Sequence, residues 1–175
     1  SAQVKSGILL AGLWAEGETS VTEPEPTRDH TERMLRAFGY EVKTEGNKIS
    51  LVGGGKLVGT DIQVPSDISS AAFFMVGAAI TEGADVILEA VGINPTRTGV
   101  IEILKQMGSD ISVENERIAG GEPIADIHIK GSRTLKGIHM PEDQVPLAID
   151  EFPALFIAAA CAEGQTVLTG AAELR

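Results

Sequence analysis

Cysteine, aromatic residues and positive charge are all scarce in this 175-residue chain. Its single cysteine, Cys161, cannot form an internal disulfide or a cysteine-ligated zinc cluster, so a disulfide scaffold and most structural metal sites are excluded. The 14 Lys and Arg residues stand against 25 Asp and Glu residues, which gives a net charge of −11. Because nucleic acids and anionic membranes attract basic surfaces, we expect neither as a partner.

Long hydrophobic runs are missing as well. One of the longest, from Ala71 to Ile80, is shorter than the roughly 20 residues that a membrane-spanning helix needs. The first residues lack a basic segment followed by an apolar one, so no signal peptide is expected and the predicted location is the cytoplasm. The histidines show no metal-ligand spacing, and we predict neither a metal site nor a cofactor.

Apolar residues make up 43% of the chain and glycines number 20, which predicts a globular α/β protein with a core of Ala, Val, Ile and Leu. Helical apolar spacing occurs in segments 3–15, 28–38, 69–81, 97–107 and 147–162. Short β-branched runs predict strands at 19–22, 41–44, 49–52, 61–64, 86–90, 111–113, 127–129 and 166–168. Cys161, on the last helix, is expected to be a small core residue.

The predicted elements recur along the chain. Ala15-Glu16-Gly17, Thr81-Glu82-Gly83 and Ala162-Glu163-Gly164 each end an Ala-rich helix at a glycine that can adopt a left-handed conformation. Pro26-Thr27-Arg28 returns 69 positions later as Pro95-Thr96-Arg97, and each Thr is predicted to cap a helix. A unit of about 70 residues therefore occurs about two and a half times, which predicts a truncated repeat protein.

The three helix ends align at offsets of 66 and 147 residues, which makes Gln3, Ser69 and Asp150 equivalent positions in the first helical turn. Helix N-termini present unpaired N–H groups and favour anions. Ser1-Ala2-Gln3 is therefore a candidate seat for a phosphate or carboxylate with Arg28 as its partner, although ordinary caps and a solvated arginine give the same pattern. Asp150 is a candidate general base if equivalent helix starts face one cleft, and otherwise a helix cap.

Four segments of the chain form a distinctive set, namely Ser-Ala-Gln-Val-Lys-Ser at 1–6, Pro-Thr-Arg-Asp-His-Thr-Glu at 26–32, Asn-Pro-Thr-Arg-Thr-Gly at 94–99 and Ile-Asp-Glu-Phe-Pro at 149–153. In their order and separations they resemble the 5-enolpyruvylshikimate-3-phosphate synthase family, most closely the class II branch that includes glyphosate-tolerant bacterial enzymes. The resemblance implies an α/β fold of βαβαββ repeats in two lobes, of which this chain is an incomplete central part. Residues 1–64 would end the first globe, and residues 65–175 would belong to the second, with a hinge near Pro65.

The resemblance also implies a reaction of the shikimate pathway. The enolpyruvyl group of phosphoenolpyruvate would move to the 5-hydroxyl of shikimate-3-phosphate, with release of phosphate and without a cofactor. Ser1, the backbone of Ala2, Gln3 and Arg28 would bind shikimate-3-phosphate, and Asp150 would take part in proton transfer at the 5-hydroxyl. Family segments that hold phosphoenolpyruvate are absent from these 175 residues, so we expect the chain alone to be inactive.

Two alternatives stay open at this point. One is the related UDP-N-acetylglucosamine enolpyruvyl transferase, whose nucleotide site and loop cysteine are not evident here. The other is a non-catalytic assembly module that self-associates through exposed repeat ends.

Overall fold

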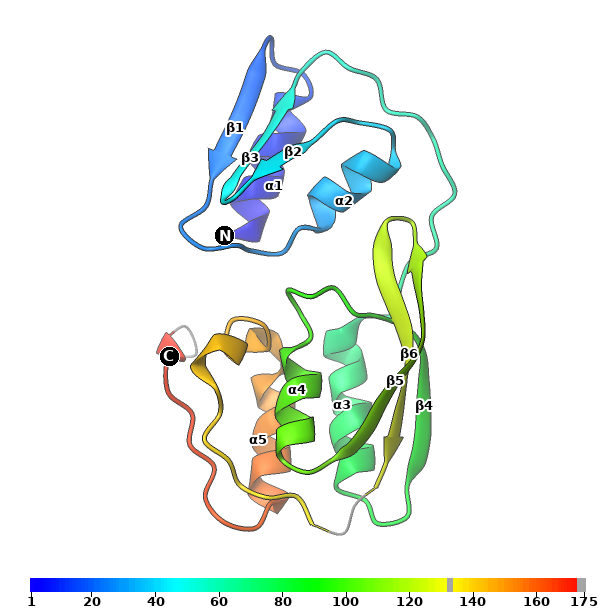
Figure 1. Ribbon diagram of the computed structural model, residues 1–175, viewed down its shortest axis with the longest axis vertical. Helices are drawn as coiled ribbons and strands as arrows, with labels where there is room; N and C mark the ends of the chain where they lie inside the picture. Colours follow the sequence, from blue (N-terminus) through cyan, green and yellow to red (C-terminus); the bar gives the residue numbers. More distant parts are fainter. Residues whose placement is uncertain (132–133, 173–175) are drawn as a thin grey trace. The chain divides into compact units, whose positions relative to one another are not determined.

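The computed structural model describes residues 1–131 and 134–172. The chain folds into two compact units. The first consists of Ser1–Val64 together with Ala119–Glu122, and the second consists of Pro65–Ile118 together with the described residues from Pro123 onward. Among the described residues, each unit has a three-stranded sheet (Figure 1). Each unit also has its own cluster of buried apolar side chains. The fold is mixed α/β, as the composition predicted.

The first unit packs helix α1 (Ala2–Gly12) against a small antiparallel sheet (Figure 1). The sheet contains β1 (Glu18–Thr22), β2 (Lys43–Glu45) and β3 (Lys48–Val52) in the order β1-β3-β2. Helix α2 (His30–Ala37) connects β1 to β2. The buried core of this unit consists of Leu9, Leu35, Tyr40, Val42, Ile49 and Leu51.

The second unit packs three helices against one another beside its sheet (Figure 1). The helices are α3 (Ile68–Ala79), α4 (Gly99–Gln106) and α5 (Phe152–Cys161). The sheet has the order β4-β6-β5, formed by β4 (Asp85–Gly92), β5 (Asp110–Ala119) and β6 (Glu122–Lys130). Two short 3-10 helices, η1 (Glu142–Gln144) and η2 (Ile149–Glu151), lead into α5.

All five predicted helices are present in the described residues, but most end earlier than predicted. Helix α1 ends at Gly12 and α3 at Ala79, so the repeated glycines lie a few residues beyond the helices. Gly17, Gly83 and Gly164 nevertheless have positive φ angles of 83°, 76° and 90°. The left-handed conformations predicted from the repeat are therefore confirmed, although their place at the helix ends is not.

The prediction that Thr27 and Thr96 cap helices is wrong. Helix α2 follows Asp29 and α4 follows Thr98, two residues later than predicted in each copy. The Thr27 hydroxyl instead donates a hydrogen bond to Glu23, and the Thr96 hydroxyl bonds within its own turn. Ser and Thr side chains stabilise turns as readily as helix starts, which is why the sequence pattern alone misplaces the caps.

Two predicted strands do not form within the part of the chain that the structure describes. Residues 61–64 belong to no sheet, and residues 166–168 contribute only an isolated bridge at Val167. A β-branched segment becomes a strand only where a neighbour supplies the ladder hydrogen bonds. Strand β5 is much longer than the predicted 111–113. The prediction missed its second half because residues 114–118 are exposed and show no alternation of apolar and polar side chains.

The last helix begins later than predicted. Residues 149–151 form the 3-10 helix η2, and α5 starts only at Phe152. The buried residues of α5 are Phe152, Ala154, Leu155 and Ala158, and Cys161 at the end of the helix is not among them. The expectation that Cys161 is a core residue is therefore wrong, because its side chain is exposed.

Candidate functional site

The start of α1 carries three of the predicted site residues. Ser1 directly precedes the helix, and Gln3 lies in its first turn with both residues exposed. The Ser1 hydroxyl donates to Oε1 of Gln3 at 2.6 Å and accepts no capping hydrogen bond from a backbone N–H of the helix. The first turn contains no acidic side chain, so its N–H groups keep their partial positive charge. This helix start therefore suits an anion.

The segment that carries Arg28 contacts the same helix through the preceding residue, Thr27. The Nζ atom of Lys5, one turn into α1, lies 3.5 Å from the backbone oxygen of Thr27. The backbone N–H of Lys5 in turn donates to the oxygen of Ser1 at 3.1 Å. Arg28 is itself only partly exposed. The structure thus joins the Arg28 segment to the first turn of α1, which the sequence pattern could only suggest.

A buried charge cluster lies beneath this helix start, and the sequence analysis missed it. Lys5 is 2% exposed, and its Nζ lies 3.1 Å from Oε2 of Glu23 and 2.7 Å from Oε1 of Glu32. Glu23 also accepts hydrogen bonds from the hydroxyl and the N–H of Thr27. A usable signal was present, because Lys5 is one turn before Leu9 on the apolar face of α1.

Electrostatics favour the charged form of Glu23. Burial alone would raise the pKa of its carboxyl, but hydrogen bonds from Thr27 and Lys5 and the charge of Lys5 outweigh burial, so the pKa lies below its usual value. The second oxygen of Glu32, Oε2, is a buried atom without a hydrogen-bond partner in the described structure. Two carboxylates therefore share one buried ammonium group, and the cluster depends on Lys5.

Asp150, the predicted base, lies in η2 of the second unit and is exposed. The neighbouring Glu151 directly precedes α5, but its carboxylate makes no capping hydrogen bond to the helix backbone. That carboxylate is instead buried and accepts a hydrogen bond from the Ser69 hydroxyl. The predicted site residues are divided between the two units. The first unit contains Ser1, Ala2, Gln3 and Arg28, and the second contains Asp150.

Asp67 is a further acidic residue close to Ser69, at the start of α3. It caps α3 by accepting from the N–H groups of Ser69 at 3.3 Å and Ser70 at 3.0 Å, and its Oδ1 lies 3.6 Å from Nη2 of Arg97. Burial alone would raise the pKa of the Asp67 carboxyl. Hydrogen bonds from Ser70 and Ser69, together with the charge of Arg97, hold this pKa below its usual value of 3.8.

The lowered pKa of Asp67 predicts a pH-dependent stability. Because its pKa is lower in the folded than in the unfolded chain, its charge stabilises the second unit above about pH 4, and this contribution is lost as the pH falls through the folded pKa. Asp67→Asn should lower the free energy of unfolding at pH 7 by about 0.3–1 kcal/mol and have a smaller effect at pH 2. Urea unfolding followed by circular dichroism checks this, with Asp110→Asn as the exposed control. An effect of Asp67→Asn that is equal at both pH values would contradict it.

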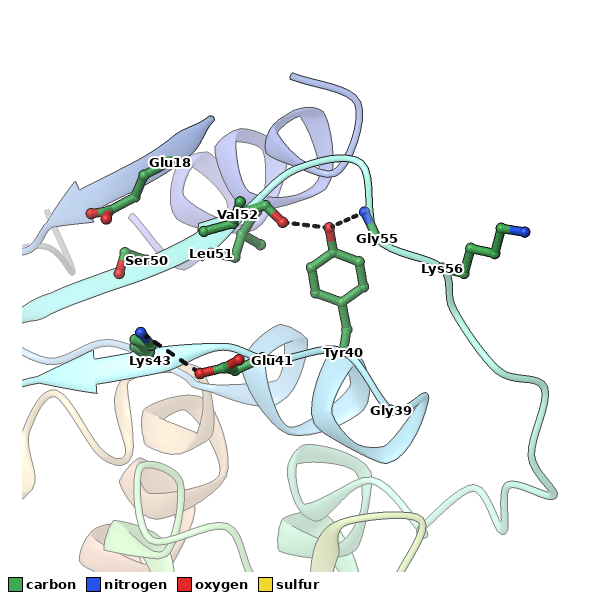
Figure 2. Close-up of a pocket in the computed structure, with 10 residues that line it drawn as sticks. All are labelled: Glu18, Gly39, Tyr40, Glu41, Lys43, Ser50, Leu51, Val52, Gly55 and Lys56. Carbon is green, nitrogen blue, oxygen red and sulfur yellow. Dashed lines mark hydrogen bonds and ion pairs between the residues drawn. The ribbon is translucent and has the colours of Figure 1, made fainter. Parts of the chain in front are cut away.

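A surface pocket of about 230 Å³ lies in the first unit, but none of the predicted site residues lines it. Figure 2 shows the Tyr40 ring at its wall, where the hydroxyl donates to the oxygen of Val52 at 2.7 Å and accepts from the N–H of Gly55 at 3.2 Å. Lys43 and Glu41 pair with each other at 3.7 Å. These polar groups already have partners, so we assign no chemistry to this pocket.

No group of three or more His, Cys, Asp or Glu side chains among residues 1–131 and 134–172 is arranged to hold a metal ion. In the same residues, every helix is too short or too polar to cross a membrane.

Comparisons with known proteins agree on one family. The family description EPSP synthase (3-phosphoshikimate 1-carboxyvinyltransferase) matches residues 1–175. A 3-phosphoshikimate 1-carboxyvinyltransferase from Methylococcus capsulatus is 69% identical over the whole chain, and one from Alkalilimnicola ehrlichii is 66% identical. The solved structure of EPSP synthase from Acinetobacter baumannii is 96% identical over 99% of the chain, with a TM-score of 0.94. The chain covers 40%, 39% and 39% of these three proteins, respectively.

Proposed function

Because this chain belongs to the EPSP synthase family, we propose that it forms part of a 3-phosphoshikimate 1-carboxyvinyltransferase. The observation that carries the proposal is the family match over all 175 residues. The chain spans about 40% of the length of the curated relatives it matches, so the proposed activity is that of an enzyme in which these residues are joined to the relatives' additional segments. Residues 1–64 would belong to its first globe and residues 65–175 to its second.

The proposed substrates are shikimate-3-phosphate and phosphoenolpyruvate. The start of α1 would bind shikimate-3-phosphate through Ser1, the N–H of Ala2 and Gln3. Arg28 would add a guanidinium group, which pairs well with phosphate oxygens. The contact of Lys5 with Thr27 supports this assignment, because it ties the Arg28 segment to the helix. We assign no residue of this chain to the cations that hold phosphoenolpyruvate.

Asp150 is the proposed base. The oxygen of the 5-hydroxyl would attack C2 of phosphoenolpyruvate while Asp150 accepts the hydroxyl proton, and an acid not assigned here would protonate the methylene carbon. Loss of that added proton and cleavage of the C2–O bond to phosphate would then restore the double bond. Exposure of Asp150 supports the role, because a base must reach the substrate.

Arg28→Ala should weaken binding of shikimate-3-phosphate to the chain by about 10- to 150-fold, because a charge-assisted hydrogen bond is worth about 1.5–3 kcal/mol. Titration calorimetry with the 175-residue chain measures this directly. Lys43→Ala is the matched control, since it removes the positive charge of an exposed side chain on strand β2 of the same unit. Equal affinity of the Arg28 variant and the unmodified chain, or an equal loss in both variants, would count against the proposed seat.

Self-association and location stay predictions. Large apolar side chains are exposed on three helices, among them Val4, Phe73, Phe74, Phe156 and Ile157. They support self-association of the isolated chain through surfaces that lack a packed neighbour. Sedimentation equilibrium tests this by measuring the mass in solution. The cytoplasm remains the proposed location.

A further inference from the structure

Glu151 is a buried carboxylate directly beside the exposed Asp150. Its side chain is only 2% exposed, although glutamate is almost never fully buried without partners. The proposed reaction gives Glu151 no role, and the helix that it precedes does not use it as a cap. A buried charge of this kind needs a structural reason.

The partners of Glu151 come from two other segments of the second unit. The Ser69 hydroxyl, at the start of α3, donates to Oε1 of Glu151. Arg97, just before α4, donates from Nη2 to the Ser69 oxygen and lies 3.5 Å from the same Glu151 oxygen. Only 17% of the Arg97 side chain is exposed. Glu151 thereby fixes the end of η2 to the starts of two helices.

The sequence repeat relates the contact between Arg97 and Glu151 to the proposed substrate seat in the first unit. Ser69 is equivalent to Gln3, and Arg97 is equivalent to Arg28, at offsets of 66 and 69 residues. In the first copy these positions form the proposed seat for an anionic substrate. In the second copy the anion is the chain's own carboxylate, Glu151. The arginine of the second copy is therefore occupied internally and holds η2 in place.

A second attachment fixes the other end of the same segment. The N–H of Gly99, at the start of α4, donates to the oxygen of Leu147 at 3.3 Å. A Cβ atom at Gly99 would lie 2.8 Å from the oxygen of Gln144 and 2.9 Å from the Cβ of Ala148, so only glycine allows this approach. Asp150 thus lies between two attached points, with Glu151 the closer one.

We propose that Glu151 is a positioning residue for Asp150: its carboxylate, held by Ser69 and Arg97, orients the η2 turn so that Asp150 reaches the 5-hydroxyl. This inference rests on the proposed function. Its consequence for catalysis is specific, because a small displacement of a base costs turnover while leaving substrate binding in the other unit untouched.

The test uses Glu151→Gln, which keeps the size of the side chain and an acceptor for Ser69 but removes the buried one of the two negative charges that Arg97 faces, the other being that of Asp67. In the 175-residue chain, amide hydrogen exchange of residues 149–152 should become about 10-fold faster, because a charge-assisted bond becomes a neutral one. Glu102→Gln, which removes an exposed carboxylate from α4, is the control and should leave this exchange unchanged. Unchanged exchange in Glu151→Gln would overturn the inference.

The second arm measures kinetics in the grafted enzyme, in which this chain replaces the matching residues of the Acinetobacter baumannii enzyme. Glu151→Gln should lower kcat by about 10- to 100-fold and leave KM for shikimate-3-phosphate within about twofold. If the role of Glu151 were purely structural, Glu151→Gln would lower the thermal midpoint of unfolding without lowering kcat selectively relative to KM. That result, or an unchanged kcat, would overturn the inference. Asp150→Asn distinguishes the two proposals. Full activity of that variant would contradict the proposed base and with it the role of Glu151, whereas a loss of kcat in Asp150→Asn with an unchanged kcat in Glu151→Gln would contradict the role of Glu151 alone.

Discussion

Lys5→Met should lower the free energy of unfolding of the first unit by about 3–5 kcal/mol, because it leaves uncompensated charge in the interior. Lys5 is the cation between Glu23 and Glu32, which are 7% and 2% exposed. Methionine fills a similar volume, so the expected loss comes from the unpaired carboxylates rather than from a cavity. The same change should loosen the Arg28 segment, since it removes the contact with Thr27.

Amide hydrogen exchange of β3 measures this effect within the first unit. The control is Lys43→Met, which removes an exposed lysine from the neighbouring strand β2 and should change the unfolding free energy by less than about 0.5 kcal/mol. The triple variant Lys5→Met with Glu23→Gln and Glu32→Gln should recover much of the loss, because no buried charge is then unpaired. A single Lys5→Met variant as stable as the unmodified chain would show that the cluster is not a structural anchor.

Asp150→Asn should lower kcat of the grafted enzyme by about 10²- to 10⁴-fold, the range typical of a lost general base. Asparagine keeps the size and the hydrogen-bonding geometry of the side chain but cannot accept the hydroxyl proton at neutral pH. Because the proposed substrate seat lies in the other unit, KM for shikimate-3-phosphate should change little. Steady-state kinetics with both substrates provide the measurement.

The control for Asp150→Asn is Asp143→Asn, an exposed acid in the nearby η1 that is given no catalytic role. It should keep kcat within about twofold of the grafted enzyme. If both variants lose activity to the same degree, the general loss of acidic charge rather than the base would explain the effect. If neither does, Asp150 is not the base.

The helices could be predicted from the sequence for two different reasons. Helices α2 and α4 have a clear apolar face, and α1, α3 and α5 are Ala-rich segments with few charged residues. The starts of α1 and α3 were predicted to within one residue, but the start of α2 was not. The Thr27 hydroxyl can either cap a helix or hydrogen-bond to Glu23, and only the tertiary fold determines which of the two it does. Strand β5 was mostly missed for a related reason. Its exposed second half has no apolar alternation, and the pairing with β6 that makes it a strand is not a local property.

Some residues of the candidate site could likewise be predicted from the sequence, and others could not. Exposed residues at helix starts, such as Gln3 and Asp150, follow from the repeat and from the resemblance to a family. Lys5 and Glu151 did not, because the sequence presents them as ordinary charged residues and only tertiary packing buries them. Each is a neighbour of a predicted site residue along the helix or turn. The structure therefore adds buried charges beside the predicted site residues, which the sequence did not reveal.

The most direct test of the central claim is the release of phosphate from phosphoenolpyruvate in the presence of shikimate-3-phosphate. We expect none from the 175-residue chain alone, because losing several preorganised charge partners typically costs about 10²- to 10³-fold each. The grafted enzyme should release phosphate at a rate close to that of the Acinetobacter baumannii parent, with which this chain is 96% identical. Turnover by the chain alone at the parent's rate, or a folded but inactive graft, would contradict the account.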